Sequence, residues 1–128
     1  MDWTAELYVH AMAVEDEAAR RYALLARRTL AESHTEAAAV FAELAAQDGQ
    51  HLEALRRRTA GMTLPALTSD YTWRADDAAG ALDAEKHARA FFEHAGRIAR
   101  EREARSLAQE MAEDENRHIA LLERLIAS

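Results

Sequence analysis

The chain is 128 residues long, which is about one ordinary domain with a single sizeable core, and this length excludes a multidomain enzyme. The absence of cysteine excludes disulfides, cysteine-ligated zinc, iron–sulfur clusters and a thiol nucleophile, so histidines and carboxylates are the strong metal ligands that remain. The net charge of -7, with 30% charged residues of both signs, argues against nucleic acid or a membrane surface as a partner.

The composition strongly favours helix. The chain has 31 Ala and 14 Leu against three Val, three Ile and one Pro, and we therefore predict an all-α protein. No stretch approaches the roughly 20 apolar residues of a membrane span, and the first residues lack a basic segment that leads into an apolar one. We expect a cytoplasmic protein.

Two helices are predicted in the first half of the chain. Apolar residues such as Leu7 and Val14 recur at helical spacing from about residue 3 to residue 30. Ser33 and Glu36 fit a capping box, which predicts a second helix over about 34–60. The arginine run at 56–58 suits the negative end of that helix, where we expect it to be solvated.

A connection follows over residues 61–76, which include the only proline and show no sustained period. Some 16 extended residues at ~3.3 Å each can span about 50 Å, enough to run the full length of a helical bundle. We expect Tyr71 and Trp73 to fix this crossover against the bundle, with exposed aromatics as the alternative interpretation.

Two more helices are predicted in the second half, over about 77–95 and 102–127. The first can start at the Asp76–Asp77 pair and stop at Gly96. Short links within each half make neighbouring helices antiparallel. The predicted architecture is a four-helix bundle of two hairpins, joined by one long crossover between the second and third helices.

Two segments of the form acid-x-x-His stand out, from Asp48 to His51 and from Glu115 to His118. Residues three apart lie about 60° apart on one helix face, so the carboxylate and the imidazole can converge on one metal ion. The spacing alone is weak evidence, because a chain this rich in acids would show about one such pair by chance.

An acid on the preceding helix makes the pattern more specific. Glu15 and Glu85 both fall on apolar helix faces, where an unpartnered carboxylate would be costly. The two halves form an internal repeat, with offsets of 70 residues between Glu15 and Glu85 and 67 residues between His51 and His118. Two divalent cations would neutralise four buried carboxylates, and oxygen and imidazole ligands suit iron or manganese better than structural zinc.

In these residues the whole chain resembles the rubrerythrin-like branch of the ferritin-like di-iron proteins. The resemblance implies a single ferritin-like domain over residues 1–128 that holds two iron ions, with manganese or zinc as alternatives. It implies that Glu15 with His51 holds one ion and Glu85 with His118 the other. Asp48 and Glu115 would bridge the two ions. It also implies that Tyr22, seven residues after Glu15, donates a hydrogen bond to a ligand carboxylate.

The implied activity is reduction of peroxide or O2, oxidation of Fe(II), or both, with an unidentified electron donor. Because apolar helix faces left over outside a four-helix core often pair, we expect a homodimer. A non-catalytic metal-binding protein and a metal-free helical interaction bundle are the alternatives. Three residues depart from the family pattern: Asp48 is shorter than the usual Glu, Gly49 weakens its helix, and Ala88 replaces an extra Glu of some rubrerythrins. A cysteine-rich rubredoxin module is absent.

The remaining histidines are not proposed as ligands. His10, His34, His87 and His94 lie off the predicted apolar faces or near a helix start, and we expect all four to be solvated.

Overall fold

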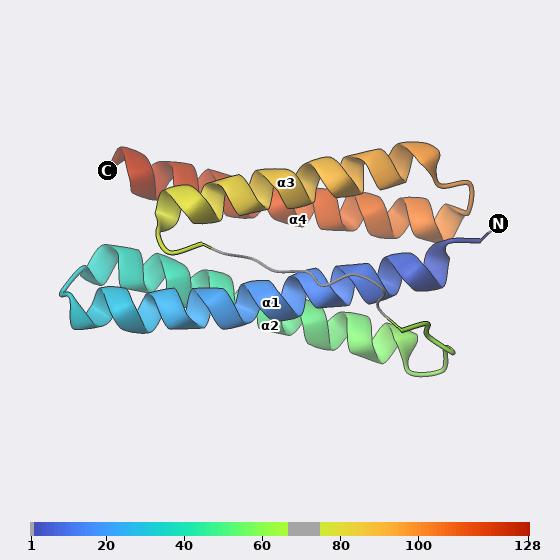
Figure 1. Ribbon diagram of the computed structural model, residues 1–128, viewed down its shortest axis with the longest axis horizontal. Helices are drawn as coiled ribbons and strands as arrows, with labels where there is room; N and C mark the ends of the chain where they lie inside the picture. Colours follow the sequence, from blue (N-terminus) through green and yellow to red (C-terminus); the bar gives the residue numbers. More distant parts are fainter. Residues whose placement is uncertain (1, 67–74) are drawn as a thin grey trace.

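The structure is a computed structural model that describes residues 2–66 and 75–128 (Figure 1). The described part is helical, which confirms the all-α prediction. Its four helices are α1 (Thr4–Ala31), α2 (Thr35–Thr59), α3 (Ala78–Ile98) and α4 (Arg102–Ala127). Each begins and ends within three residues of the bounds expected from the sequence.

Two details of the helix ends differ from expectation. The capping box at Ser33 is wrong, because Ser33 adopts a left-handed φ of 65° and the N-cap of α2 is His34, without a side-chain cap. The predicted stop at Gly96 is also wrong: α3 continues to Ile98, because Gly96 keeps a negative φ and packs against Ala108 of α4.

The start of α3 follows the prediction. Asp77 is its N-cap, and the carboxylate accepts a hydrogen bond of 2.8 Å from the backbone N–H of Gly80. This bond satisfies one of the amides that the first turn of a helix leaves free.

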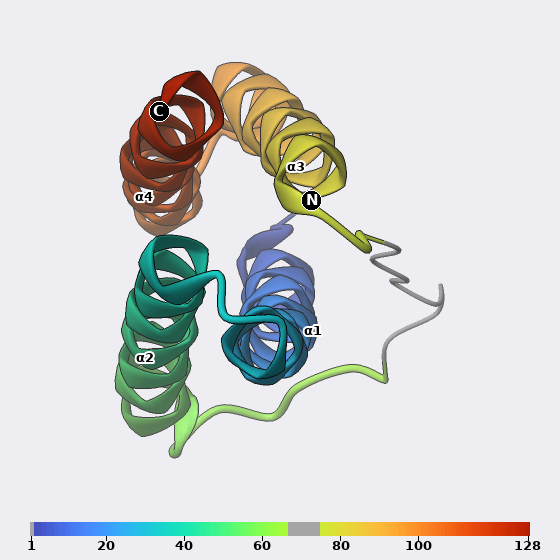
Figure 2. The same ribbon diagram turned by 90° about the vertical axis from the view of Figure 1, so that its left-hand side faces the viewer.

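The helices form two antiparallel hairpins that lie side by side, α1 with α2 and α3 with α4 (Figures 1 and 2). Helix α2 ends at one end of the bundle and α3 begins at the other (Figure 1). This arrangement is the predicted ferritin-like four-helix bundle with one long crossover. Tyr71 and Trp73, expected to fix the crossover, lie outside the described residues.

The apolar core is divided into two clusters. One contains Tyr8, Val14, Leu55, Phe92, Leu107 and Met111, and the other contains Tyr22, Leu25, Phe41, Leu44, Ala81 and Leu122. Along every helix the residues of one cluster are separated from those of the other by buried polar residues. The polar layer in the middle of the bundle is therefore contributed by all four helices.

No helix in the described part of the chain is long and apolar enough to cross a membrane.

Candidate metal centre

The polar layer consists of carboxylates and imidazoles that are almost completely excluded from solvent. Five side chains that the sequence singled out occupy it, each at most 3% exposed: Glu15, Asp48, Glu85, Glu115 and His118. His51, the sixth, is half-buried at the α2–α4 face. All six predicted ligands thus lie in one layer.

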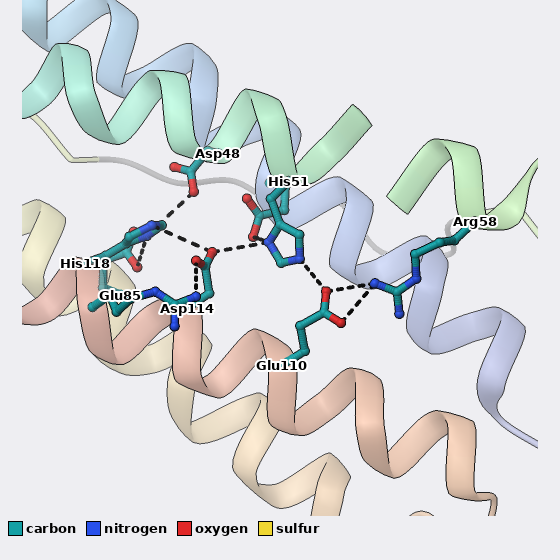
Figure 3. Close-up of polar contacts among 9 residues, drawn as sticks. Asp48, His51, Arg58, Glu85, Glu110, Asp114 and His118 are labelled. Atoms are coloured by element: carbon teal, nitrogen blue, oxygen red, sulfur yellow. Dashed lines mark hydrogen bonds and ion pairs between the residues drawn. The ribbon is translucent and has the colours of Figure 1, made fainter. Parts of the chain in front are cut away.

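His51 brings the two hairpins together (Figure 3). Its Nδ1 lies 3.2 Å from Oε1 of Glu15 on α1 and 3.2 Å from Oδ2 of Asp114 on α4. Its Nε2 points the other way, toward the carboxylate of Glu110, at 2.7 Å. Nδ1 is therefore the ring nitrogen that faces the polar layer.

His118 occupies the centre of the layer and is fully buried. Its Nδ1 lies 3.3 Å from Oε2 of Glu85 and 3.6 Å from Oδ1 of Asp48, and its Nε2 lies 3.7 Å from Oδ2 of Asp114. Asp114 therefore lies between the two imidazoles (Figure 3).

The potential ligand atoms fall into three groups, within each of which the atoms lie no more than 4.8 Å apart. The groups are Glu15 with His51 and Asp114, Asp48 with Asp114 and His118, and Glu85 with Glu115 and His118. The pairs Glu15–His51 and Glu85–His118 are thus brought together as the sequence suggested. None of the three groups contains both Asp48 and His51, the first acid-x-x-His pair.

Several atoms of this layer lack a hydrogen-bond partner within the described residues. They are Oε2 of Glu15, Oδ2 of Asp48, Oε2 of Glu85 and both ring nitrogens of His118. A buried polar atom without a partner costs about 1–3 kcal/mol, more when it carries charge. Five such atoms converging in one layer fit a group that accepts lone pairs, and the oxygen and imidazole donors suit a divalent metal ion.

Burial makes two of the carboxylates hard to ionise. Removal from water raises the pKa of Asp48 well above its usual value, and the negative charges of Glu15 and Glu85 raise it further. Burial likewise raises the pKa of Glu115 well above its usual value, with the neighbouring Glu85 adding to the effect. Both side chains therefore hold a proton more tightly in the folded chain than an exposed carboxylic acid does.

For the two imidazoles, burial and the neighbouring carboxylates shift the pKa in opposite directions. Burial by itself would lower the pKa of His51, but hydrogen bonds to Asp114 and Glu15 outweigh it and raise the pKa to about 11. The pKa of His118 is also raised, because the Glu85 carboxylate outweighs the effect of burial. Both imidazoles therefore hold a proton more tightly than an exposed histidine does.

Tyr22 supports one of the carboxylates from within the core. Its hydroxyl donates a hydrogen bond of 2.8 Å to Oε1 of Glu85, across from α1 to α3. This is the contact that the family resemblance implied. Burial raises the pKa of Tyr22 well above its usual value, so the phenol remains a donor.

Sequence reasoning missed three residues of the layer and its edge: Asp114, Glu110 and Arg58. Glu110, Asp114 and His118 follow one another at intervals of four on α4, a spacing that places them on one helix face and that could have revealed both acids. Arg58, expected to be solvated with its neighbours, donates two hydrogen bonds of 2.9 Å to the Glu110 carboxylate. It lies seven residues after His51, on the same face of α2.

Three of the remaining histidines are exposed as expected: His34, His87 and His94. The expectation for His10 is wrong. His10 is half-buried, because its ring stacks on Phe91 with centroids 4.1 Å apart and meets the edge of Phe92. Burial lowers the pKa of His10, which therefore acts as a neutral aromatic ring at pH 7.

Comparison with known proteins gives a structural match but no function. No protein-family model matches the chain, and no curated protein matches its sequence. The crystal structure of an uncharacterized conserved protein from Magnetospirillum magnetotacticum is similar, with a TM-score of 0.89 and 27% sequence identity over 96% of this chain and 93% of that chain. The match supports the four-helix fold and assigns no activity.

Proposed function

We propose that the chain is a di-iron carboxylate protein of the rubrerythrin-like kind, which reduces peroxide or O2, oxidises Fe(II), or does both. The observation that carries the proposal is the set of unpartnered buried atoms on Glu15, Asp48, Glu85 and His118. A bundle whose polar core served only for packing would pair these atoms with one another.

The residues would divide between two ions. Glu15 and His51 would hold one ion, Glu85 and His118 the other, and Asp48 and Glu115 would complete the set between them. Asp114 lies within reach of both imidazoles and adds a fifth carboxylate to the four that the sequence predicted. A bound pair of iron ions would supply the electrons for reduction of O2 or peroxide.

The surroundings of the layer support redox chemistry. Phe92 and Met111 lie in the apolar cluster on one side of the layer, and Phe41 and Leu44 lie in the cluster on the other side. These side chains exclude bulk water from the ligand oxygens. Tyr22 holds Glu85 in place through its hydrogen bond, so this carboxylate is oriented before any ligand arrives. The electrons would come from a donor outside these residues or from Fe(II) itself.

The test is an anaerobic titration of metal-stripped protein with Fe(II), in which bound iron is counted per chain, followed by addition of peroxide. We expect two irons per chain and rapid oxidation, seen as growth of near-ultraviolet absorbance. The variant Glu85→Ala should bind less iron than wild type. Its control is Glu93→Ala, an exposed substitution on the same helix, which should still bind two irons per chain.

The alternatives predict different results. Two bound irons that peroxide and O2 leave reduced would indicate a non-catalytic metal-binding protein. Failure of the wild-type protein to bind iron, manganese or zinc would indicate a metal-free bundle and would refute the proposal.

A further inference from the structure

The two imidazoles of the layer are supported unequally. His51 uses one ring nitrogen inside the layer and the other outside it, where Nε2 lies 2.7 Å from Oε2 of Glu110. Neither ring nitrogen of His118 has a hydrogen-bond partner among the described residues. Within the described residues, His51 therefore differs from His118 in having a carboxylate outside the layer at hydrogen-bond distance from its second ring nitrogen.

Glu110 is itself held in place. Nη1 of Arg58 donates to both carboxylate oxygens at 2.9 Å, and Nη2 of the same guanidinium donates to the hydroxyl of Tyr8 at 3.2 Å. The hydroxyl of Tyr8 donates in turn to Glu103 at 3.0 Å. Tyr8 is only 2% exposed, so the series of contacts begins at a side chain that is held by the core.

These contacts form a continuous line from the core through Tyr8, Arg58 and Glu110 to His51. The Glu110 side chain is 37% exposed and that of His51 is 14% exposed, so the line runs along the α2–α4 face at the edge of the polar layer. A carboxylate that accepts from one ring nitrogen of a histidine keeps the proton on that nitrogen and leaves the other free to bind a metal.

We infer that Glu110, held by Arg58, is a positioning residue for His51, which fixes the ring with a proton on Nε2 and directs the lone pair of Nδ1 toward Glu15 and Asp114. The inference rests on the proposed function, because it assigns Nδ1 of His51 to a metal ion. Its consequence is asymmetry: Glu110 strengthens binding at the Glu15–His51 position and leaves the Glu85–His118 position unaffected.

The first experiment is calorimetric titration of metal-stripped protein with Zn(II), which is redox-inert and takes the same ligands. In Glu110→Ala we expect the dissociation constant of one of the two ions to rise about 10- to 100-fold and that of the other to stay unchanged. Glu110→Gln, whose amide oxygen can still accept from Nε2, should recover much of the loss. Glu113→Ala, an exposed substitution on the same helix, is the matched control.

A second pair of variants tests the role of the guanidinium. Arg58→Met should weaken the same ion as Glu110→Ala, by a smaller factor, because Glu110 then keeps its charge but loses its support. Arg57→Met removes an exposed neighbouring charge and should leave both ions unchanged.

The second readout is the ring state of His51, which a merely structural role of Glu110 would not change. In zinc-loaded protein labelled with 15N-histidine, we expect the His51 ring, assigned with His51→Gln, to carry its proton on Nε2 and the metal on Nδ1. Glu110→Ala should shift the His51 ring signals and leave those of His118 in place.

Three outcomes would overturn the inference, and they differ from one another. If the wild-type chain binds no zinc, the proposed function fails together with the inference. If it binds two ions and Glu110→Ala binds both equally well with unchanged His51 signals, only the inference fails. Equal weakening of both ions in Glu110→Ala, with circular dichroism showing intact helices, would also refute it, because the effect would not be specific to His51.

Discussion

At the residue scale, the pKa values of neighbouring buried acids are shifted in opposite directions although the acids lie side by side. The pKa of Glu115 is raised well above its usual value by burial and by Glu85. The pKa of Glu85 is lowered instead, because its interactions with Glu115, His118 and Tyr22 outweigh the effect of burial. Of the two acids, Glu115 therefore holds its proton more tightly and Glu85 ionises more readily.

The substitution Glu115→Gln tests the raised pKa of Glu115. We expect metal-free Glu115→Gln to be more stable than wild type by about 1 kcal/mol at pH 7, because the amide keeps a donor and avoids the cost of protonating a buried acid. Zinc binding should weaken at least tenfold, since the amide brings no negative charge. Urea unfolding and zinc calorimetry measure the two effects.

The control is Glu113→Gln, two residues away and exposed, which should change neither quantity. A metal-free Glu115→Gln protein less stable than wild type would contradict the raised pKa of Glu115.

The residues found from the sequence are those that repeat. Glu15 and Glu85, like His51 and His118, recur in both halves, and the apolar stripes around them revealed their burial. Asp114 and Glu110 break the repeat: on the equivalent face of α2 the chain has Gln47 and Glu43, which bond to each other. The spacing of four residues places Asp114 on the face of His118, but its contact with His51 on the other hairpin is visible only in the structure.

At the element scale, α2 carries an interior glycine next to one of the acids. Gly49 lies in the middle of α2, and a Cβ at this position would meet no atom within 4 Å. The helix therefore loses stability at Gly49 without a steric reason.

Gly49→Ala should stabilise the protein by about 0.5–1 kcal/mol in urea unfolding, because alanine restricts the unfolded chain and favours helix. Gly80→Ala is the control: its Cβ would lie 3.2 Å from Oδ1 of Asp77, the cap of α3, so no gain is expected there. Destabilisation by Gly49→Ala would show that α2 needs this glycine for a reason other than space.

The extents of the helices were predictable and the details of their ends were not. Periodicity located all four helices because each is more than 20 residues long and buries one face. The Asp77 cap was found because its carboxylate binds a local amide. The link between α1 and α2 is short, and Ser33 takes a left-handed conformation that directs the chain into α2, so its side chain cannot act as the predicted cap.

At the scale of the whole molecule, the raised pKa values determine how stability depends on pH. His51, with a pKa raised from 6.5 to about 11, stays protonated in the folded chain after the unfolded chain has lost that proton. Its contribution is complete below pH 6.5 and is lost as the pH rises toward 11. The pKa values of Asp48 and Glu115 are also raised, so their contributions to stability also decrease as the pH rises above their unfolded pKa of about 4.

We therefore expect the Tm of the metal-free protein to fall between pH 6 and pH 9, measured by calorimetry at constant ionic strength. Stabilisation by zinc should have the opposite pH dependence, because the ligands must lose their protons to bind it. The increase in Tm on adding zinc should therefore grow with pH. A metal-free Tm that rises over this range would contradict the charge states assigned to the layer.

The division of contacts among the helices has a consequence for how the molecule opens. Each hairpin packs far more extensively within itself than against the other. Two of the three potential ligand groups, both of which contain Asp114, take residues from both hairpins. In the metal-free protein the easiest sub-global unfolding is then separation of two intact hairpins, and an ion bound at Asp114 would act as a reversible cross-link that suppresses it.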